Sequence, residues 1–371
     1  MTQPVLFEEI PTADGYVVAR ATLNAEKSIN SLTLEMIGLL DRQLLAWQDN
    51  PQVACVVLDG AGDKGFCAGG DVRKLYESAR ECGMTKRNDY AESFFGQEYR
   101  LDYRIHTYPK PIVAWGHGVV MGGGVGLFAG ASHRIVTEST RFAMPEITIG
   151  LFPDVGGSFF LNRMPGRTGL FLGLTGAHCN AADVLFLGLA DRFIAHAQRQ
   201  AVIAALVAAS WTESVPLNRA TTGNLLRRFE RANSVERPLS NVRAHFELIG
   251  QLADADDCDA VVAQILACDS TEPWIQRAQK TLRGGCPATA LLVWEQIRRG
   301  KYLSLADVFR MELIVAVQCL RHPDFAEGVR ALLIDKDNTP QWQHRDVASV
   351  PQKYLDEFFS APFDPHPLAD L

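Results

Sequence analysis

The chain has 371 residues, of which 47% are hydrophobic and 21% are charged, an ordinary globular composition that allows a large core. A formal net charge of −7 argues against nucleic acid as a partner, since such proteins present a basic face to phosphates. The sequence has no run of about 18 apolar residues for a membrane span and no basic, then apolar, secretion signal at its start. We therefore expect a cytoplasmic protein with neither a nucleic-acid nor a membrane partner.

The N-terminal half alternates short apolar runs with segments of helical periodicity. Helical spacing predicts a helix over 33–49, with Thr33 as its N-cap. This alternation is typical of an α/β domain with mostly parallel strands. The apolar runs predict strands at residues 16–23, 54–59, 111–120 and 133–137.

From about residue 196 the sequence consists of long helical stretches, with no flexible linker before them. We therefore expect a core at 1–200 and a C-terminal helical extension at 201–371 that packs on the core. The eight cysteines are scattered and have no paired or metal-ligating spacing, which predicts free thiols and no metal site.

Two stretches are rich in glycine: GFCAGGD at 65–71 and VVMGGGVGL at 119–127. Glycines allow a ligand to approach backbone N–H groups, which suits an anion or a developing oxyanion. Tight packing between a helix and a strand is an equal alternative. A third reading is a relaxed dinucleotide fingerprint over 124–129, although Glu138 follows more closely than that fingerprint expects.

Two acids lie in the otherwise apolar stretch FAMPEITIGLFPDVGG at 142–157. A buried carboxylate must be paired, hydrogen-bonded or protonated, so Glu146 and Asp154 could face one cavity and perform acid–base or nucleophilic chemistry. The alternative is structural, with Glu146 capping a helix and Asp154 starting a turn.

Together, these motifs resemble the crotonase (enoyl-CoA hydratase/isomerase) superfamily over about the first 200 residues. The resemblance implies a spiral of ββα units and an acyl-CoA substrate, with no metal and no further cofactor, since CoA is part of the substrate. It also implies an oxyanion hole in which the backbone N–H groups of Gly70 and Gly123 bind the thioester oxygen. Relatives often form trimers or hexamers, so a homo-oligomer is one expectation.

The chain departs from the usual hydratase pattern at Gly126, where a hydratase carries the first of its two catalytic glutamates. Glu146 matches the second, and Asp154 stands where hydratases have glycine. With Glu98 and the segment HPDFAEGVRALLIDKDNTPQW at 322–342, the chain resembles a thioester-hydrolase branch of the superfamily. That resemblance implies hydrolysis of 3-hydroxyisobutyryl-CoA to 3-hydroxyisobutyrate and CoA, in valine breakdown.

The resemblance implies that Glu146 activates water or attacks the carbonyl carbon. Asp154 would hold the substrate's 3-hydroxyl or protonate the leaving thiolate, and Glu98 would help to fix the hydroxyl. Two alternatives stay open at this point. One is a hydratase or isomerase that acts on another acyl-CoA with Glu146 alone, and the other is a non-catalytic acyl-CoA binder.

Overall fold

The computed structural model describes residues 3–371, which form two compact units built from alternating segments of the chain. The first unit consists of residues 3–70, Arg100–Phe142 and Cys179–Ser240. The second consists of Asp71–Tyr99, Ala143–His178 and Asn241–Leu371. These two units do not coincide with the predicted domains 1–200 and 201–371, which were divided at a single boundary. The division into those two domains stays a prediction.

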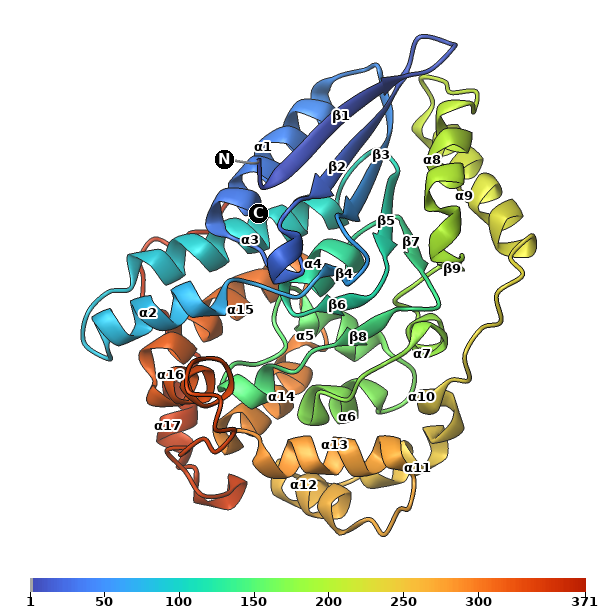
Figure 1. The fold of residues 1–371 in the computed structure, drawn as a ribbon. Coiled ribbons are helices and arrows are strands. Elements are labelled where there is room, and N and C mark those ends of the chain that lie inside the picture. The colour runs from blue at the N-terminus through green and yellow to red at the C-terminus, as the bar shows by residue number, and fades with distance from the viewer. Residues whose placement is uncertain (1–2) are drawn as a thin grey trace. The chain divides into compact units, whose positions relative to one another are not determined.

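A six-stranded sheet forms the centre of the first unit, in the order β1-β2-β3-β5-β7-β9 (Figure 1). β1 and β2 pair antiparallel, and all further neighbours are parallel, as the alternation of strands and helices predicts. A smaller sheet has the order β4-β6-β8. The strands are Val5–Pro11 (β1), Val17–Leu23 (β2), Val53–Gly60 (β3), Gly65–Cys67 (β4), Ile112–Gly116 (β5), Val119–Met121 (β6), His133–Val136 (β7), Arg141–Ala143 (β8) and Arg192–Phe193 (β9).

Three of the four predicted strands agree with β2, β3 and β7 to within one residue at each end. The prediction of one strand over 111–120 is wrong, because this stretch divides into β5 and β6, which belong to different sheets. The chain turns at Gly118, where φ is +52° and a Cβ atom would collide with the backbone of Lys64. Only glycine fits such a turn, and an apolar run does not reveal it.

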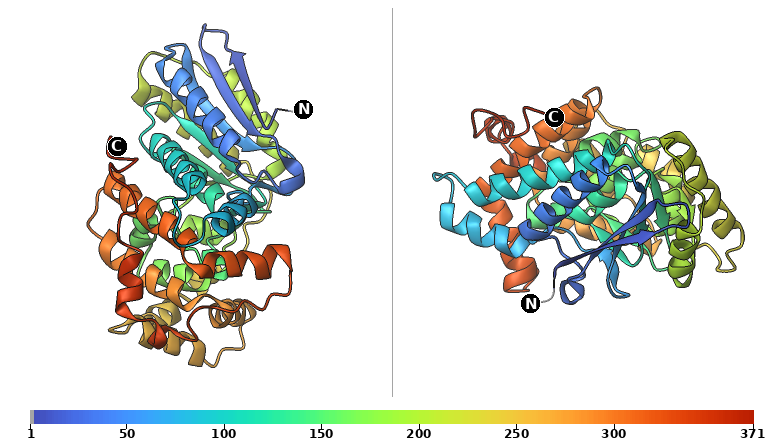
Figure 2. Two further views of the ribbon diagram at one scale, coloured as in Figure 1. Left: turned by 90° about the vertical axis from the view of Figure 1, so that its left-hand side faces the viewer. Right: turned by 90° about the horizontal axis from the view of Figure 1, so that it is seen from above.

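Helices cover both faces of the six-stranded sheet (Figures 1 and 2). On one face lies α1 (Leu34–Asp49), whose Trp47 donates a hydrogen bond to Glu9 of β1, and Thr33 caps this helix as predicted. On the other face α8 (Arg199–Val207) and α9 (Val215–Arg231) enclose a core with alternate residues of the strands. That core contains Val18, Cys55, Val57, Val113, Trp115, Ile135, Ile203, Leu206, Leu225 and Leu226.

The second unit is almost entirely helical, and its part beyond residue 240 agrees with the prediction of helices from about residue 196 onward. α3 (Asp89–His106) continues from this unit into the first, which also holds α4 (Gly123–Ala129) and α7 (Ala181–Phe186). The helices of the second unit are α2 (Val72–Cys82), α5 (Gly157–Phe160), α6 (Thr168–Thr175), α10 (Asn241–Ala244), α11 (Phe246–Leu252), α12 (Cys258–Ala267), α13 (Pro273–Gly284), α14 (Pro287–Gly300), α15 (Leu305–Arg321), α16 (Pro323–Val329) and α17 (Gln352–Glu357).

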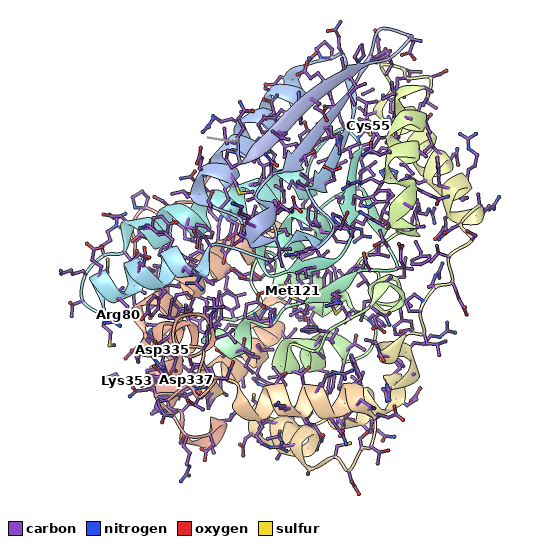
Figure 3. All side chains as sticks on the ribbon, viewed as in Figure 1. Cys55, Arg80, Met121, Asp335, Asp337 and Lys353 are labelled. Atoms are coloured by element: carbon purple, nitrogen blue, oxygen red, sulfur yellow. The ribbon has the colours of Figure 1, made fainter. Side chains whose placement is uncertain are left out.

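The structure bears on the cysteines and on the search for a membrane span. All eight cysteines are free thiols, as predicted, and Cys55 in β3 is labelled in Figure 3. Within residues 3–371, no helix combines the length and apolar character that crossing a membrane requires.

A buried ion pair links β2 and β3 in the first unit and provides a test of the fold. Asp59 is fully buried and accepts hydrogen bonds from Arg20 Nη2 at 2.8 Å and Thr22 Oγ1 at 2.7 Å. We expect Asp59→Ala to lower the free energy of unfolding by about 3–5 kcal/mol, because it leaves Arg20 without its buried partner. Urea unfolding followed by circular dichroism measures this loss.

The control for this prediction is Glu77→Ala, which breaks the exposed pair of Lys74 and Glu77 in α2. Exposed pairs contribute little to stability, so we expect almost no change. If both variants lost the same free energy of unfolding, the Asp59 pair would not stabilise the fold more than an exposed pair does.

Candidate active site

The two glycine-rich stretches lie next to each other in the first unit. β4 and β6, which lead into them, pair in parallel. A Cβ atom on Gly69, whose φ is +107°, would lie 3.7 Å from the amide nitrogen of Gly123. α4 begins at Gly123, so this amide is among the first N–H groups of a helix, which have no acceptor within the helix. The fold therefore brings the Gly70 loop and the Gly123 amide into one neighbourhood.

Close packing explains the next two glycines of α4. A Cβ atom on Gly124 would lie 2.6 Å from the carbonyl oxygen of Cys67, and one on Gly126 would lie 2.5 Å from Oδ2 of Asp102. Tight packing therefore accounts for glycine at positions 124 and 126, without a bound dinucleotide. Because Asp102 is fully buried beside Gly126, the structure also explains why no glutamate stands there.

The second unit brings the three predicted acids into one buried cluster. Glu98 comes from α3, Glu146 begins a short 3-10 helix (η2, Glu146–Ile149), and Asp154 lies in the loop before α5. Their exposed fractions are only 2%, 5% and 3%. Within residues 3–371, the charged groups that shift the pKa values of these acids are other carboxyls, with no cation among them.

Asp154 is the member of the cluster whose ionised form is best stabilised. Burial raises its pKa to about 6, but the hydroxyl of Tyr99, which donates to Asp154 Oδ2 at 2.6 Å, opposes that rise. Tyr99 is itself fully buried, and burial together with the neighbouring carboxyls keeps the pKa of its hydroxyl well above the usual value. The hydroxyl therefore stays protonated and able to donate.

Glu98 and Glu146 are buried without comparable support. Oε1 of Glu98 and Oε2 of Glu146 are buried atoms with no hydrogen-bond partner. Burial, and then the charge of Asp154, raise the pKa of each carboxyl well above its usual value. Burial therefore favours the protonated forms of Glu98 and Glu146, whereas the Tyr99 hydroxyl favours the ionised form of Asp154.

A strained turn carries Asp154 and is held by an acid that the sequence analysis did not select. Val155 and Gly156 have φ values of +51° and +89°, and positive φ is a genuine outlier for a β-branched residue. Glu312 of α15 is fully buried and accepts hydrogen bonds from the amides of Gly156 and Ser158, each at 2.7 Å. Burial raises the pKa of Glu312 to about 8, although the two amides favour its ionised form.

The C-terminal segment that resembled the hydrolase branch supports the turn of Glu146. α16 packs against η2, where a Cβ atom on Gly150 would meet the backbone of Asp324 and one on Gly328 would meet the backbone of Ile149. After α16, Arg330 bonds to Glu327 and also to Asp335 and Asp337, which Figure 3 labels. The motif therefore has a structural role beside the buried acids.

One further cavity, of about 520 Å³, lies in the first unit between the turn at Asp14 and the residues near Thr212. It contains none of the predicted site residues. Two of its charged groups form hydrogen bonds within the chain: Asp14 accepts from Thr12 and Trp211, and Lys110 donates to two backbone carbonyls.

Sequence reasoning missed Tyr99, Val155 and Glu312 as members of this site. The signal for Glu312 was present, because it is an acid within the apolar run of α15, the same pattern that selected Glu146. Tyr99 directly follows Glu98, but adjacency does not reveal a hydrogen bond to Asp154. No sequence pattern predicts positive φ at Val155.

The chain belongs to the enoyl-CoA hydratase/isomerase (crotonase) family, whose pattern, described as Enoyl-CoA hydratase/isomerase, matches residues 18–359. This confirms the predicted resemblance. A protein of Danio rerio named "3-hydroxyisobutyryl-CoA hydrolase, mitochondrial" is 38% identical to this chain, over 96% of the chain and 89% of that protein. The Homo sapiens protein of the same name is 34% identical, over 92% of the chain and 85% of that protein.

Two crystal structures confirm the crotonase-like α/β fold. An enoyl-CoA hydratase from Rhodobacter sphaeroides superimposes with a TM-score of 0.82 and 33% identity, over 97% of this chain and 98% of that chain. A carnitinyl-CoA dehydratase from Mycobacterium thermoresistibile gives a TM-score of 0.84 and 34% identity, over 99% and 98% of the two chains. The fold is therefore common to relatives whose names describe different reactions on CoA esters.

The contact of Gly126 with Asp102 gives a prediction for the first unit. We expect Gly126→Ala to lower the free energy of unfolding by about 1–3 kcal/mol, because the added methyl group would collide with the buried carboxyl group. Chemical denaturation measures the change. The matched control is Gly250→Ala, since a Cβ atom at this position in α11 meets nothing within 4 Å. If both variants were as stable as the wild type, the packing explanation of Gly126 would be wrong.

Proposed function

We propose that this chain hydrolyses the thioester of 3-hydroxyisobutyryl-CoA, giving 3-hydroxyisobutyrate and CoA in valine catabolism. The observation that carries the proposal is the buried cluster of Glu98, Glu146 and Asp154, which lies in a chain that hydrolase-named relatives match over more than nine-tenths of its length. The cluster has the acid and base groups that attack on a thioester requires.

In the proposed reaction, Glu146 acts on the thioester and Asp154 serves the leaving group. Attack requires an ionised Glu146, whereas burial and the charge of Asp154 raise the pKa of Glu146 in the resting cluster. Passing one proton from Glu146 to Asp154 produces the working pair without changing the total charge. Asp154 then protonates the thiolate of CoA, and the protonated Glu98 donates a hydrogen bond to the substrate's 3-hydroxyl.

Glu146 can act by either of two routes. As a base it takes a proton from water, the water oxygen bonds to the carbonyl carbon, and the C–S bond breaks. As a nucleophile it bonds to that carbon itself, the C–S bond breaks, and water then opens the mixed anhydride. Transfer of oxygen-18 from labelled water into Glu146 in a single turnover would support the anhydride route.

For the oxyanion, we propose that the amides of Gly70 and Gly123 bind the thioester oxygen. Backbone donors suit this role because they are fixed before the reaction, and losing one such donor typically costs about 3–4 kcal/mol of transition-state stabilisation. The glycines at this position keep side chains away from the carbonyl group.

We further propose that the reaction uses no metal and no cofactor, and that the enzyme works in the cytoplasm, where its free thiols stay reduced. Relatives named 3-hydroxyisobutyryl-CoA hydrolase carry the word mitochondrial in their names. Cell fractionation distinguishes these compartments, and gel filtration tests the proposed homo-oligomer.

A second candidate is hydration of an enoyl-CoA, because one structure that superimposes over nearly the whole chain is named an enoyl-CoA hydratase. Gly126 argues against it, since Asp102 leaves no room there for the first hydratase glutamate.

We expect the purified chain to release free CoA from 3-hydroxyisobutyryl-CoA, followed with a thiol reagent, and to leave crotonyl-CoA unhydrated. Hydration without thiol release would replace hydrolysis by the second candidate. Tight binding of the CoA ester with neither reaction would indicate a non-catalytic acyl-CoA binder.

We expect Glu146→Gln and Asp154→Asn each to lower kcat by about 10²–10⁴-fold, because each removes a group that transfers a proton. Circular dichroism and thermal unfolding should show an intact fold, since both changes keep the size of the side chain. The control is Glu295→Gln in α14, a largely buried acid that pairs with Arg298 and Arg299. Wild-type activity in either cluster variant would contradict the assigned roles.

A further inference from the structure

Two side chains outside the predicted set contact Asp154 or the turn that carries it. We propose that Tyr99 and Glu312 are positioning residues for Asp154, with Tyr99 fixing its carboxylate and Glu312 fixing the turn that follows it. The proposal rests on the proposed thioester hydrolysis, and it identifies the residues that decide where the charge of the cluster lies.

The Tyr99 hydroxyl reaches Asp154 from a ring that has little freedom to move. Its ring contacts those of Phe95 and Phe309, with a centroid distance of 5.8 Å in each pair. The hydroxyl donates to Asp154 Oδ2 at 2.6 Å, a short distance that is typical of a hydrogen bond to a carboxylate. A phenol held in this way stabilises the ionised form of Asp154 and fixes the direction of its carboxylate.

Glu312 acts on the backbone immediately after Asp154. Its two oxygens accept from the amides of Gly156 and Ser158, and the carbonyl of Asp154 accepts from Gly157 in the same turn. Amides that converge in this way form an anion-binding nest. Glu312 therefore offsets the strain of Val155 and holds Asp154 at one place on the backbone.

Asp154 faces titratable groups from three elements. They are Glu98 and Tyr99 of α3, Glu146 of η2, and Glu312 and Cys319 of α15. Among them, Tyr99 is the group that donates a hydrogen bond to the Asp154 side chain. Glu98 Oε1 and Glu146 Oε2 have no hydrogen-bond partner. We infer from this difference in geometry that Asp154 is the first acid of the cluster to ionise.

The first test is the pH dependence of kcat/KM for 3-hydroxyisobutyryl-CoA in Tyr99→Phe. The cluster must carry one negative charge in order to react. That charge is lost when the ionised Asp154 takes up a proton from solution, so the wild-type rate should fall as the pH drops through about 6. Without the hydroxyl, we expect this acid limb to move up by about one pH unit, a tenfold change in proton affinity.

The matched control is Tyr354→Phe, because the hydroxyl of Tyr354 is buried in the same unit without a hydrogen-bond partner. We expect its acid limb to coincide with that of the wild type. An unmoved acid limb in Tyr99→Phe would overturn the role of Tyr99, since loss of packing alone lowers the rate at every pH without shifting the limb.

Glu312→Gln tests the turn by a separate measurement. The amide nitrogen of glutamine faces one of the two backbone N–H groups, so one of the two hydrogen bonds is lost. We expect kcat to fall by about 10–100-fold with little change in KM, because misplacing Asp154 affects the chemical step and not binding. Wild-type kcat in Glu312→Gln, with Glu295→Gln as the control, would overturn the role of Glu312.

A failure of the proposed hydrolysis is distinguishable from a failure of this inference. If the wild type releases no CoA, infrared titration of the carboxyl groups, with Asp154→Asn subtracted, measures the protonation of Asp154 directly. We expect Asp154 to take up its proton at a higher pH in Tyr99→Phe than in the wild type. Equal protonation in the two proteins would overturn the inference whatever the reaction.

Discussion

Burial of several carboxyl groups without a cation is the constraint on which the second unit depends. Glu98, Glu146, Asp154 and Glu312 are all at most 5% exposed, and each would be expensive to ionise alone. The cluster meets this constraint in two ways. Burial favours the protonated forms of Glu98 and Glu146, while the Tyr99 hydroxyl donates to Asp154 and backbone amides donate to Glu312. A group of acids that exchange protons is suited to chemistry in which one proton is taken and another is given.

The surrounding fold holds this cluster in place at a cost in backbone strain. Positive φ at a β-branched residue such as Val155 costs about 1–3 kcal/mol and persists only where its neighbours determine it. Glu312 provides that support for the Asp154 turn, and α16 packs against the turn of Glu146. Both supports come from the helical region Asn241–Leu371 of the second unit.

The first unit contains the glycine-rich backbone and the buried Asp102 beside Gly126. Its glycines leave the backbone near Gly123 free of side chains. Asp102 beside Gly126 removes one glutamate, while Asp154 in the second unit adds another acid. Relatives that superimpose over nearly the whole chain carry hydratase and dehydratase names, so the fold alone does not identify the reaction.

The sequence by itself determined the fold family, the parallel strands and the long helices, and it suggested five residues that stay predictions as site residues. These follow from short-range signals: apolar periodicity, glycine runs, and acids in apolar surroundings. Only the tertiary structure decided which acids share protons, because burial and hydrogen bonds depend on residues as far apart as Asp154 and Glu312. It also decided that 111–120 forms two strands and that Val155 is strained, since both depend on backbone contacts that side-chain patterns do not record.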